Sequence, residues 1–338
     1  MTINNGRRDV VVIGGSAGAL EAMRKLVSLL QKDLQAAILL VIHIPNEFPS
    51  YLAKILSRSG TLPAVAVKGK ERIQEGRIYV AAPDRHLLVE DGHLVASRGP
   101  RENRHRPAID PLFRSAARAY GRRVIGVILS GTLDDGSSGL MAVKMAGGLT
   151  VVQDASEAEY PEMPQRAKRY AGADYELRMA EIAELLVEAT HGAGAAGVAD
   201  GEVSMAGNEN EGEKADLKFD ANREKEGKPS AFACPECSGV LWEVEEGELL
   251  RFRCRVGHAY TADALGEEMS ESVEQALWAS MRALEEKASL LRRISERSGK
   301  KLGAEYVQEA SSFDKHVETI RGVLLRNQRM QDEEEAAG

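Results

Sequence analysis

Hydrophobic residues in the first half of the chain form short continuous runs that alternate with amphipathic stretches. Residues 10–13, 38–42 and 124–129 are uninterrupted apolar runs rich in β-branched side chains, and each is too short for a buried helix. Such runs are typical of central strands in a parallel sheet, which is covered on both faces. Between the first two runs, apolar residues recur at the spacing of a helix that crosses between parallel strands: Leu20, Met23, Leu26, Val27 and Leu30.

Further strand-like runs occupy residues 79–82, 87–89 and 149–152, so strands and helices alternate through residues 1–192. This alternation predicts an α/β domain with a doubly wound, mostly parallel sheet. Ligands of such sheets bind beyond the carboxyl ends of the strands, so residues that directly follow a strand are the first candidates for chemistry.

The second half of the chain has a different pattern. Residues 193–230 are rich in Gly, Ala, Glu and Lys with almost no large apolar side chains, which predicts a flexible acidic linker. A compact segment at 231–263 contains all three cysteines. Apolar residues then step by three or four through residues 264–331, with a break around 298–303, which predicts a helical hairpin. An acidic tail is expected at 332–338.

The composition fits an ordinary globular protein with more than one folded part: 338 residues, 43% hydrophobic, 28% charged, with a net charge of −8. Mild acidity argues against sequence-independent binding of nucleic acid, which needs a basic surface. The sequence has no apolar run of about 18 residues and no secretory signal pattern, so we expect no membrane insertion. Three cysteines without an export signal fit a reducing compartment, and we therefore expect a cytoplasmic protein.

The first apolar run continues into a glycine-rich turn, VVVIGGSAGALEAM at residues 10–23, which places Ser16 between a strand and a helix. Gly14, Ser16 and Gly18 fit the G-x-S-x-G pattern, in which closely spaced glycines turn a nucleophilic serine out over the sheet edge. The N-terminus of the next helix offers N–H groups to an oxyanion. A phosphate or dinucleotide loop is the alternative, although Ser16 replaces the second glycine of G-x-G-x-x-G and no acidic residue ends the next strand.

Two more strand ends carry the polar residues that a serine nucleophile needs. His43 ends the second run in LLVIHIP, and a loop with Asp134 and Asp135 follows the run at 124–129. Ser16, His43 and one aspartate can therefore meet at one sheet edge, with histidine as the base and aspartate holding its tautomer. A buried core histidine and an ordinary Asp-Gly turn are the alternatives. The chain order Ser, His, Asp differs from that of the α/β-hydrolases.

These residues lie within a longer resemblance. In order, the chain contains IGGSAGALEAM, VIHIPNEFPSYLAKIL, YVAAPDRHLLVEDGHL, RHRPAIDPLFRSAA, GVILSGTLDDGSSGLMAVKMAGG and MPQRA. Residues 10–167 therefore resemble the catalytic domain of the CheB family of chemotaxis protein-glutamate methylesterases. The resemblance implies Ser16 as nucleophile, His43 as base and Asp135 as the residue that orients the base. Asp135 matches because the family's aspartate immediately precedes a glycine, as Asp135 precedes Gly136.

The resemblance also implies an activity and a partner. The reaction is hydrolysis of glutamate γ-methyl esters on the helices of methylated chemoreceptor-like proteins, through an acyl-serine and without a catalytic cofactor, with glutamine deamidation as a second activity. The chain departs from the family at Ala17 to Ala19, where Thr-Gly-Gly is usual, and at Thr132 and Leu133, where Met and Gly are usual. Ala17 and Thr132 are candidates for oxyanion and substrate contacts, and Thr132 bears on rate and substrate range.

Family members typically carry an N-terminal receiver domain, whereas about ten residues precede the first expected strand here. We expect a stand-alone catalytic domain that is not regulated by phosphorylation of a receiver in cis. The main alternative is a catalytically weak signalling or scaffold module that binds receptors or partners through the cleft and the C-terminal extension. A nucleotide-binding α/β protein is a further alternative. The C-terminal helices fit a self-contained core, packing on the cysteine segment or a homo-oligomer equally well.

The cysteine segment has the spacing of a metal site. Cys234 and Cys237 form C-P-E-C, Cys254 and His258 form C-R-V-G-H, and 16 residues separate the two pairs. Two such knuckles on a small β platform bring three thiolates and one imidazole into a tetrahedron, which suits zinc. Four protein ligands leave no open position, so the sequence predicts a structural zinc in a zinc-ribbon-like module that is too small to fold well without it. A reduced cysteine pair without metal is the alternative.

Overall fold

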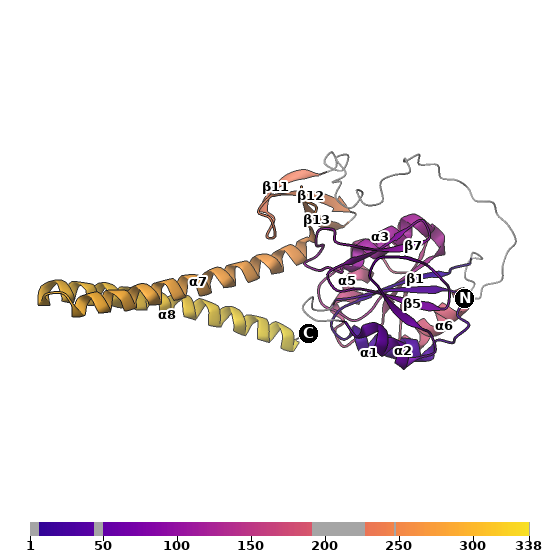
Figure 1. Cartoon of the computed structure of the whole chain (residues 1–338), viewed down its shortest axis with the longest axis horizontal. Coiled ribbons are helices and arrows are strands. Elements are labelled where there is room, and N and C mark those ends of the chain that lie inside the picture. Colours follow the sequence, from indigo (N-terminus) through magenta and orange to yellow (C-terminus); the bar gives the residue numbers. More distant parts are fainter. Residues whose placement is uncertain (1–6, 44–49, 191–226, 247, 338) are drawn as a thin grey trace. The chain divides into compact units, whose positions relative to one another are not determined.

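The computed structural model describes residues 7–43, 50–190, 227–246 and 248–337 of the chain. They form two compact units, Met1–Leu265 and Gly266–Gly338 (Figure 1). The first unit contains both the α/β domain and the cysteine segment, which the sequence predicts as separate domains. Most of the linker predicted at 193–230 lies outside the described residues.

The first unit is built on a seven-stranded parallel sheet with the order β10-β9-β8-β1-β2-β5-β3. Its strands are β1 (Val10–Gly15), β2 (Ala37–Ile42), β3 (Ala64–Val67), β5 (Arg77–Ala81), β8 (Val124–Ile128), β9 (Leu149–Gln153) and β10 (Tyr175–Leu177). From β1 the chain passes to its neighbour β2, then to β3 at the edge of the sheet and back to β5, which lies between β2 and β3. It later crosses to β8, on the other side of β1. The winding direction therefore changes between β1 and β8, which confirms the doubly wound α/β fold.

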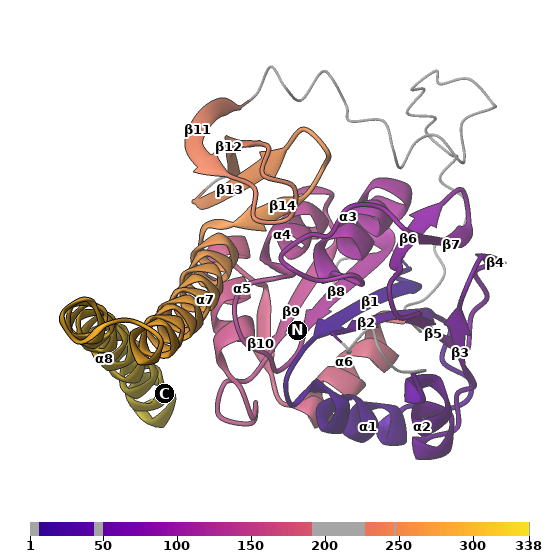
Figure 2. The ribbon, with the colours of Figure 1, turned by 60° about the vertical axis from the view of Figure 1, so that its left-hand side comes forward.

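Alternate residues of β1 pack into two different cores because side chains of a strand point to opposite faces. Val11 and Ile13 join the core under α1 (Ala19–Leu29), α2 (Leu52–Ser59) and α6 (Met179–Thr190). Val10 and Val12 join the core under α3 (Ile109–Tyr120), α4 (Ser137–Met145) and α5 (Glu162–Ala171). Figure 2 shows α1 and α2 on one side of the sheet and α3 and α4 on the other. Burial on both faces explains why the central strands are continuous apolar runs.

The run predicted at residues 87–89 belongs to a separate antiparallel sheet of β4 (Lys70–Arg72), β7 (His93–Ser97) and β6 (His86–Glu90). Strands β6 and β7 are joined by the two residues Asp91 and Gly92, which have φ values of 43° and 77°. Positive φ at both positions is the geometry of a type I′ turn, which makes a tight hairpin. A local turn therefore removes this segment from the main sheet.

The cysteine segment forms an antiparallel sheet of β11 (Lys228–Ala233), β12 (Val240–Glu246), β13 (Leu249–Cys254) and β14 (Ala259–Thr261). We call this sheet, with the four metal-site residues, the cysteine module. Its first strand begins three residues before the segment predicted at 231–263. Its own core is small and contains two of the cysteines: Cys234, Leu241, Phe252, Cys254, Tyr260 and Leu265.

The second unit consists of two long helices, α7 (Ala262–Glu296), whose first residues belong to the first unit, and α8 (Lys300–Ala337). They pack around Ala288, Leu291 and Ala310, which confirms the predicted helical hairpin. Helix α8 continues through the stretch predicted as an acidic tail. None of the helices in the described residues has the length and apolarity needed to cross a membrane.

Candidate active site

Ser16 directly follows β1, in a turn that only small residues can form. A Cβ on Gly14 would lie 2.3 Å from Ile109 Cγ2, and a Cβ on Gly15 would lie 2.5 Å from Ala19 Cβ. Gly18 has a φ of 73°, which favours glycine, and it precedes the first residue of α1. The glycines therefore bring the serine close to α3 and to the start of α1.

His43 and Asp135 follow the two strands that flank β1. The backbone N–H of His43 donates to Gly15 O at 3.2 Å, which continues the β1–β2 pairing past the last strand residue. The N–H of Ser16 donates to Ser130 O at 2.9 Å, which places the loop after β8 beside the serine. The carboxyl ends of β2, β1 and β8 are therefore adjacent, at the point where the winding of the sheet changes direction.

The three side chains form a hydrogen-bonded line. His43 Nδ1 lies 3.2 Å from Ser16 Oγ, and His43 Nε2 lies 2.8 Å from Asp135 Oδ2. Because the Asp135 carboxylate can only accept, Nε2 carries the proton and donates it, and Nδ1 is left to accept from the serine hydroxyl. The side chains of His43 and Asp135 are 7% and 3% exposed, so water competes little for their hydrogen bond.

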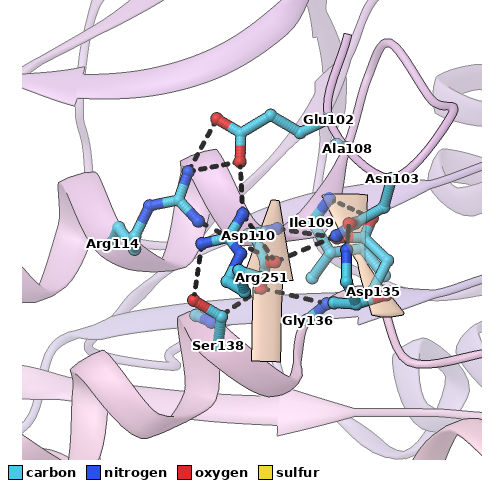
Figure 3. Close-up of polar contacts among 12 residues, drawn as sticks. Glu102, Asn103, Ala108, Ile109, Asp110, Arg114, Asp135, Gly136, Ser138 and Arg251 are labelled. Carbon is cyan, nitrogen blue, oxygen red and sulfur yellow. Dashed lines mark hydrogen bonds and ion pairs between the residues drawn. The ribbon is translucent and has the colours of Figure 1, made fainter. Parts of the chain in front are cut away.

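Asp135 is held as a carboxylate by several donors. Its oxygens accept from the backbone N–H of Ile109 at 2.7 Å and from Asn103 Nδ2 at 2.9 Å (Figure 3). They also accept from His43 Nε2. Burial by itself raises the pKa of Asp135, but the hydrogen bonds and charge of His43, with the donors Ile109 and Asn103, hold the pKa well below its usual range. Asp135 therefore remains ionised when His43 becomes charged.

The neighbouring Asp134 takes part in a different contact. Its Oδ1 accepts from Thr261 Oγ1 at 2.6 Å, at the boundary between β14 and α7. Burial raises the pKa of this carboxyl group. Of the two aspartates, the structure brings Asp135 to His43 and directs Asp134 to the cysteine module.

Two residues beside the line were assigned no role from the sequence. The ring of His105 stacks on His43, with centroids 3.6 Å apart and an angle of 17° between the planes. Burial, and then the neighbouring His43, lower the pKa of His105 to about 3, so His105 is neutral while it restricts the plane of the His43 ring. Asn103 holds Asp135 from the same loop. That loop, residues 99–107, has no periodic pattern from which either contact could be predicted.

The predicted oxyanion residues lie in the turns around Ser16. Ala17 follows the serine, and its carbonyl accepts from Ser130 Oγ at 2.8 Å. Gly131 approaches the serine so closely that a Cβ on it would lie 3.0 Å from Ser16 Cβ, and the exposed Thr132 comes next. These positions put Ala17 and Thr132 near the nucleophile, and their oxyanion role stays a prediction.

The four predicted metal ligands come together in the cysteine module. The donor atoms of Cys234, Cys237, Cys254 and His258 all lie within 4.8 Å of one another. Cys237 Sγ is 3.6 Å from Cys254 Sγ, and Cys254 Sγ is 3.5 Å from His258 Nδ1. A tetrahedron with Zn–S bonds of about 2.3 Å has edges of about 3.8 Å, so these separations suit a tetrahedral ion. The cluster is a group that can bind a metal.

Comparison with known proteins identifies the α/β domain. Residues 11–186 match the family described as CheB methylesterase. The chain belongs to the CheB methylesterase family. A relative from Leptospira interrogans, named putative protein-glutamate methylesterase/protein-glutamine glutaminase, is 39% identical over 180 residues, which cover 53% of this chain and 93% of that protein.

Other members of the family support this assignment. Protein-glutamate methylesterase/protein-glutamine glutaminase 2 of Anaeromyxobacter dehalogenans is 36% identical over 184 residues, 54% of each chain. The crystal structure of the Thermotoga maritima CheB methylesterase catalytic domain matches with a TM-score of 0.52 and 30% identity, covering 54% of this chain and 99% of that one. The predicted resemblance to the CheB family is therefore confirmed, and the family match ends before the cysteine module.

Proposed function

We propose that the protein is a serine esterase that removes methyl esters from glutamate side chains of chemoreceptor-like proteins. The observation that carries the proposal is the hydrogen-bonded line of Ser16, His43 and Asp135 across three adjacent strand ends, in a chain of the CheB methylesterase family. The names of the relatives support the substrate class and add deamidation of glutamine as a second activity. The partner is then a methylated receptor helix, and the cytoplasmic location stays a prediction.

The geometry assigns a role to each residue in the reaction. His43 Nδ1 takes the proton of Ser16 Oγ as the oxygen attacks the ester carbonyl carbon, and Asp135 stabilises the imidazolium that forms. The tetrahedral intermediate collapses as His43 returns the proton to the leaving oxygen, which releases methanol and leaves an acyl-Ser16. Water, deprotonated by His43, then attacks the acyl carbon, and His43 returns the proton to Ser16 Oγ as the acyl–oxygen bond breaks, which frees the serine and the receptor's glutamate side chain.

Charge on the carbonyl oxygen needs donors near Ser16. The first turn of α1 supplies backbone N–H groups and the positive end of the helix dipole. We assign the oxyanion contact to the N–H of Ala17, next to the nucleophile, and a substrate contact to the exposed Thr132. Removal of one such donor typically slows an enzyme by about 10²–10³-fold.

We further propose that Cys234, Cys237, Cys254 and His258 hold a structural zinc ion. Three sulfur donors and one imidazole suit zinc, and four protein ligands leave no position for substrate. The backbone turns of both knuckles support the site: Ser238 N donates to Cys234 O at 2.7 Å, and Gly257 N donates to Cys254 O at 3.0 Å. The ion would fix the fold of the module and take no part in ester hydrolysis. Oligomerisation through the C-terminal helices stays a prediction.

Methanol release from membranes that carry methylated receptors tests the esterase. The wild-type protein should release methanol and Ser16→Ala should release almost none, because no acyl-enzyme can form. Ser28→Ala is the matched control, since Ser28 lies exposed in α1 and its hydroxyl donates to the carbonyl oxygen of Lys25 in the same helix. Equal and negligible release by the wild type and Ser16→Ala would reject the esterase and favour a module that binds receptors without turnover.

A further inference from the structure

The loop at residues 99–107 lies between the cysteine module and the line of catalytic residues. Glu102 and His105 pair their backbones at 3.2 and 2.9 Å around a two-residue turn, in which Asn103 and Arg104 have φ values of 49° and 71°. The N–H of Asn103 donates to Ala259 O in β14 at 2.8 Å. The loop thus pairs with the last strand of the module, while two of its side chains contact the catalytic residues.

The amide of Asn103 has only one orientation that satisfies its partners. Nδ2 donates to Asp135 Oδ1 at 2.9 Å and to Asp110 Oδ2 at 3.0 Å, and Oδ1 accepts from the N–H of Thr261 at 3.0 Å (Figure 3 shows the first two). The side chain is buried, with 2% exposure, so water cannot replace a lost partner. Two carboxyl groups require the NH₂ end, and a backbone N–H from β14 requires the oxygen.

The buried, charged side chain of Arg251 joins the module to this loop and to α4. Arg251 in β13 donates to Glu102 Oε2 at 3.1 Å and to Ser138 Oγ in α4 at 2.9 Å (Figure 3). Glu102 also accepts from Arg114 at 2.6 Å. Burial alone raises the pKa of Glu102, but Arg114 and Arg251 together lower it to about 2, so the cluster is charged at neutral pH. Loss of Arg251 would leave part of this buried charge uncompensated.

Two of the four metal-site residues lie where β13 and β14, the strands that make these contacts, are connected. Cys254 ends β13, which carries Arg251, and His258 immediately precedes β14, which carries Ala259 and Thr261. The turn between the two ligands is closed by the N–H of Cys254, which donates to His258 O at 3.0 Å. Any loosening of this knuckle therefore moves both strands against the loop.

We propose that Asn103 is a positioning residue for Asp135, and that strands β13 and β14 of the cysteine module hold it in place. Esterase activity then requires the module to be folded and docked on the α/β domain. The inference rests on the proposed roles of Ser16, His43 and Asp135. It differs from a simple packing role, in which the contacts join two folded parts without affecting the His43–Asp135 hydrogen bond.

The variant Asn103→Gly tests the positioning role directly. Glycine adopts a φ of 49° without strain, so the variant removes the amide and keeps the turn. We expect kcat to fall about 10- to 100-fold with KM nearly unchanged, because a small misplacement of the catalytic groups has effects of this order. The low-field proton resonance of His43 Nε2–H should weaken or shift, which a packing defect alone would not cause. Arg101→Gln is the matched control, because the Arg101 side chain pairs with Glu236 of the module at 3.3 Å and, within the described part of the chain, with none of Ser16, His43 and Asp135.

A variant within the cysteine module tests whether contacts from the module affect kcat and the His43–Asp135 hydrogen bond. Arg251→Met should lower kcat and weaken the same proton resonance, while Arg101→Gln leaves both unchanged. The double variant Asn103→Gly with Arg251→Met should lose no more activity than the greater of the two single losses, because both act through Asp135. If thermal unfolding shows that Arg251→Met is unfolded, Arg251→Lys keeps the charge, breaks the paired contacts and serves instead.

Chelation of metal from the full-length protein gives a third arm. In the wild type we expect the proton resonance to weaken and kcat to fall together, and both to recover when zinc is added back. In Asn103→Gly, chelation should cause little further loss of kcat. A folded Asn103→Gly protein with wild-type kcat and an unchanged resonance would overturn the inference, even where Ser16→Ala is inactive. Wild-type methanol release by Ser16→Ala would instead overturn the proposed esterase, and the proton resonance would still report whether Asn103 positions Asp135.

Discussion

The α/β domain and the cysteine module bury their residues by different means. The domain has apolar cores on both faces of a seven-stranded sheet, whereas the core of the module consists of six residues, two of them metal-site cysteines. The two parts are joined by polar contacts that include the buried Arg251, which donates to Glu102 and Ser138. A large apolar core is stable by itself, whereas a sheet as small as the module needs a cross-link. If both proposals hold, the part of the protein that supports Asp135 is also the part whose folding needs a metal.

Removal of metal should have the largest effect, because it should unfold the cysteine module and leave the α/β domain folded. Structural zinc contributes about 10–16 kcal/mol to the folding of small zinc modules, so chelation should unfold the cysteine module and leave the unfolding transition of the α/β domain in place. Calorimetry with and without chelator measures the two transitions. Cys237→Ser should behave like the chelated protein, and Ser238→Gly, at a position with a φ of 59°, should behave like the wild type. A calorimetric profile that chelation leaves unchanged would contradict this expectation.

Substitution of the two neighbouring aspartates should separate chemistry from docking. Asp135→Asn should lower kcat by about 10⁴-fold, because the amide favours the wrong tautomer of His43. Asp134→Asn keeps an oxygen that accepts from Thr261, so its kcat should stay within about tenfold of the wild type. Steady-state kinetics of methanol release at neutral pH measures both. Similar losses in the two variants would mean that Asp135 has no special role.

A cavity in the larger core should reduce stability without involving metal. Leu40 is fully buried in the sheet, so Leu40→Ala should lower the free energy of unfolding by about 2–5 kcal/mol. Leu29→Ala, at a position that is 45% exposed, should change it by less than about 1 kcal/mol. Urea unfolding of the metal-bound and metal-free proteins measures the difference. If Leu40→Ala lowered the free energy of unfolding only in the metal-bound protein, the core of the α/β domain would depend on metal, which would contradict the proposed difference between the two regions.

Acid should weaken the docking surface through Glu102. Its pKa is about 2 in the folded protein and 4.5 ordinarily, so its contribution is complete above about pH 4.5 and is lost as the pH falls toward 2. The shift corresponds to about 3 kcal/mol. Urea unfolding at pH 5 and pH 3 should show a smaller pH dependence for Glu102→Gln than for the wild type. Equal pH dependence would show that Glu102 does not titrate in this window.

The positions of the strand ends could be predicted from the sequence because neighbouring residues determine them. Apolar runs buried on both faces identify the strands, and close glycines identify the turn at Ser16. The spacing of Cys234, Cys237, Cys254 and His258 predicts their cluster for the same reason, since each knuckle is a short turn, and the structure brings the four side chains together. In these places a few neighbouring residues determine the geometry.

The support behind Asp135 could not be predicted because its partners are distant. Asn103 meets Asp135 across 32 residues and Thr261 across 158 residues of chain. The turn that carries it has no periodic pattern, and Asn at a left-handed position explains the turn without indicating a partner. Nor does a charged residue in a short strand, such as Arg251, indicate that it will be buried. These contacts depend on how two separately patterned segments meet.

Pairing of the loop with β14 has a consequence for association between molecules. Strand β14 is the last strand of its sheet, and the loop at residues 101–103 covers its outer side through the hydrogen bonds to Ala259. A sheet edge that is covered in this way cannot serve as a template for a strand from another chain. When the module separates from the α/β domain, that edge is uncovered. Loss of docking would therefore expose the protein to edge-to-edge self-association as well as slow its chemistry.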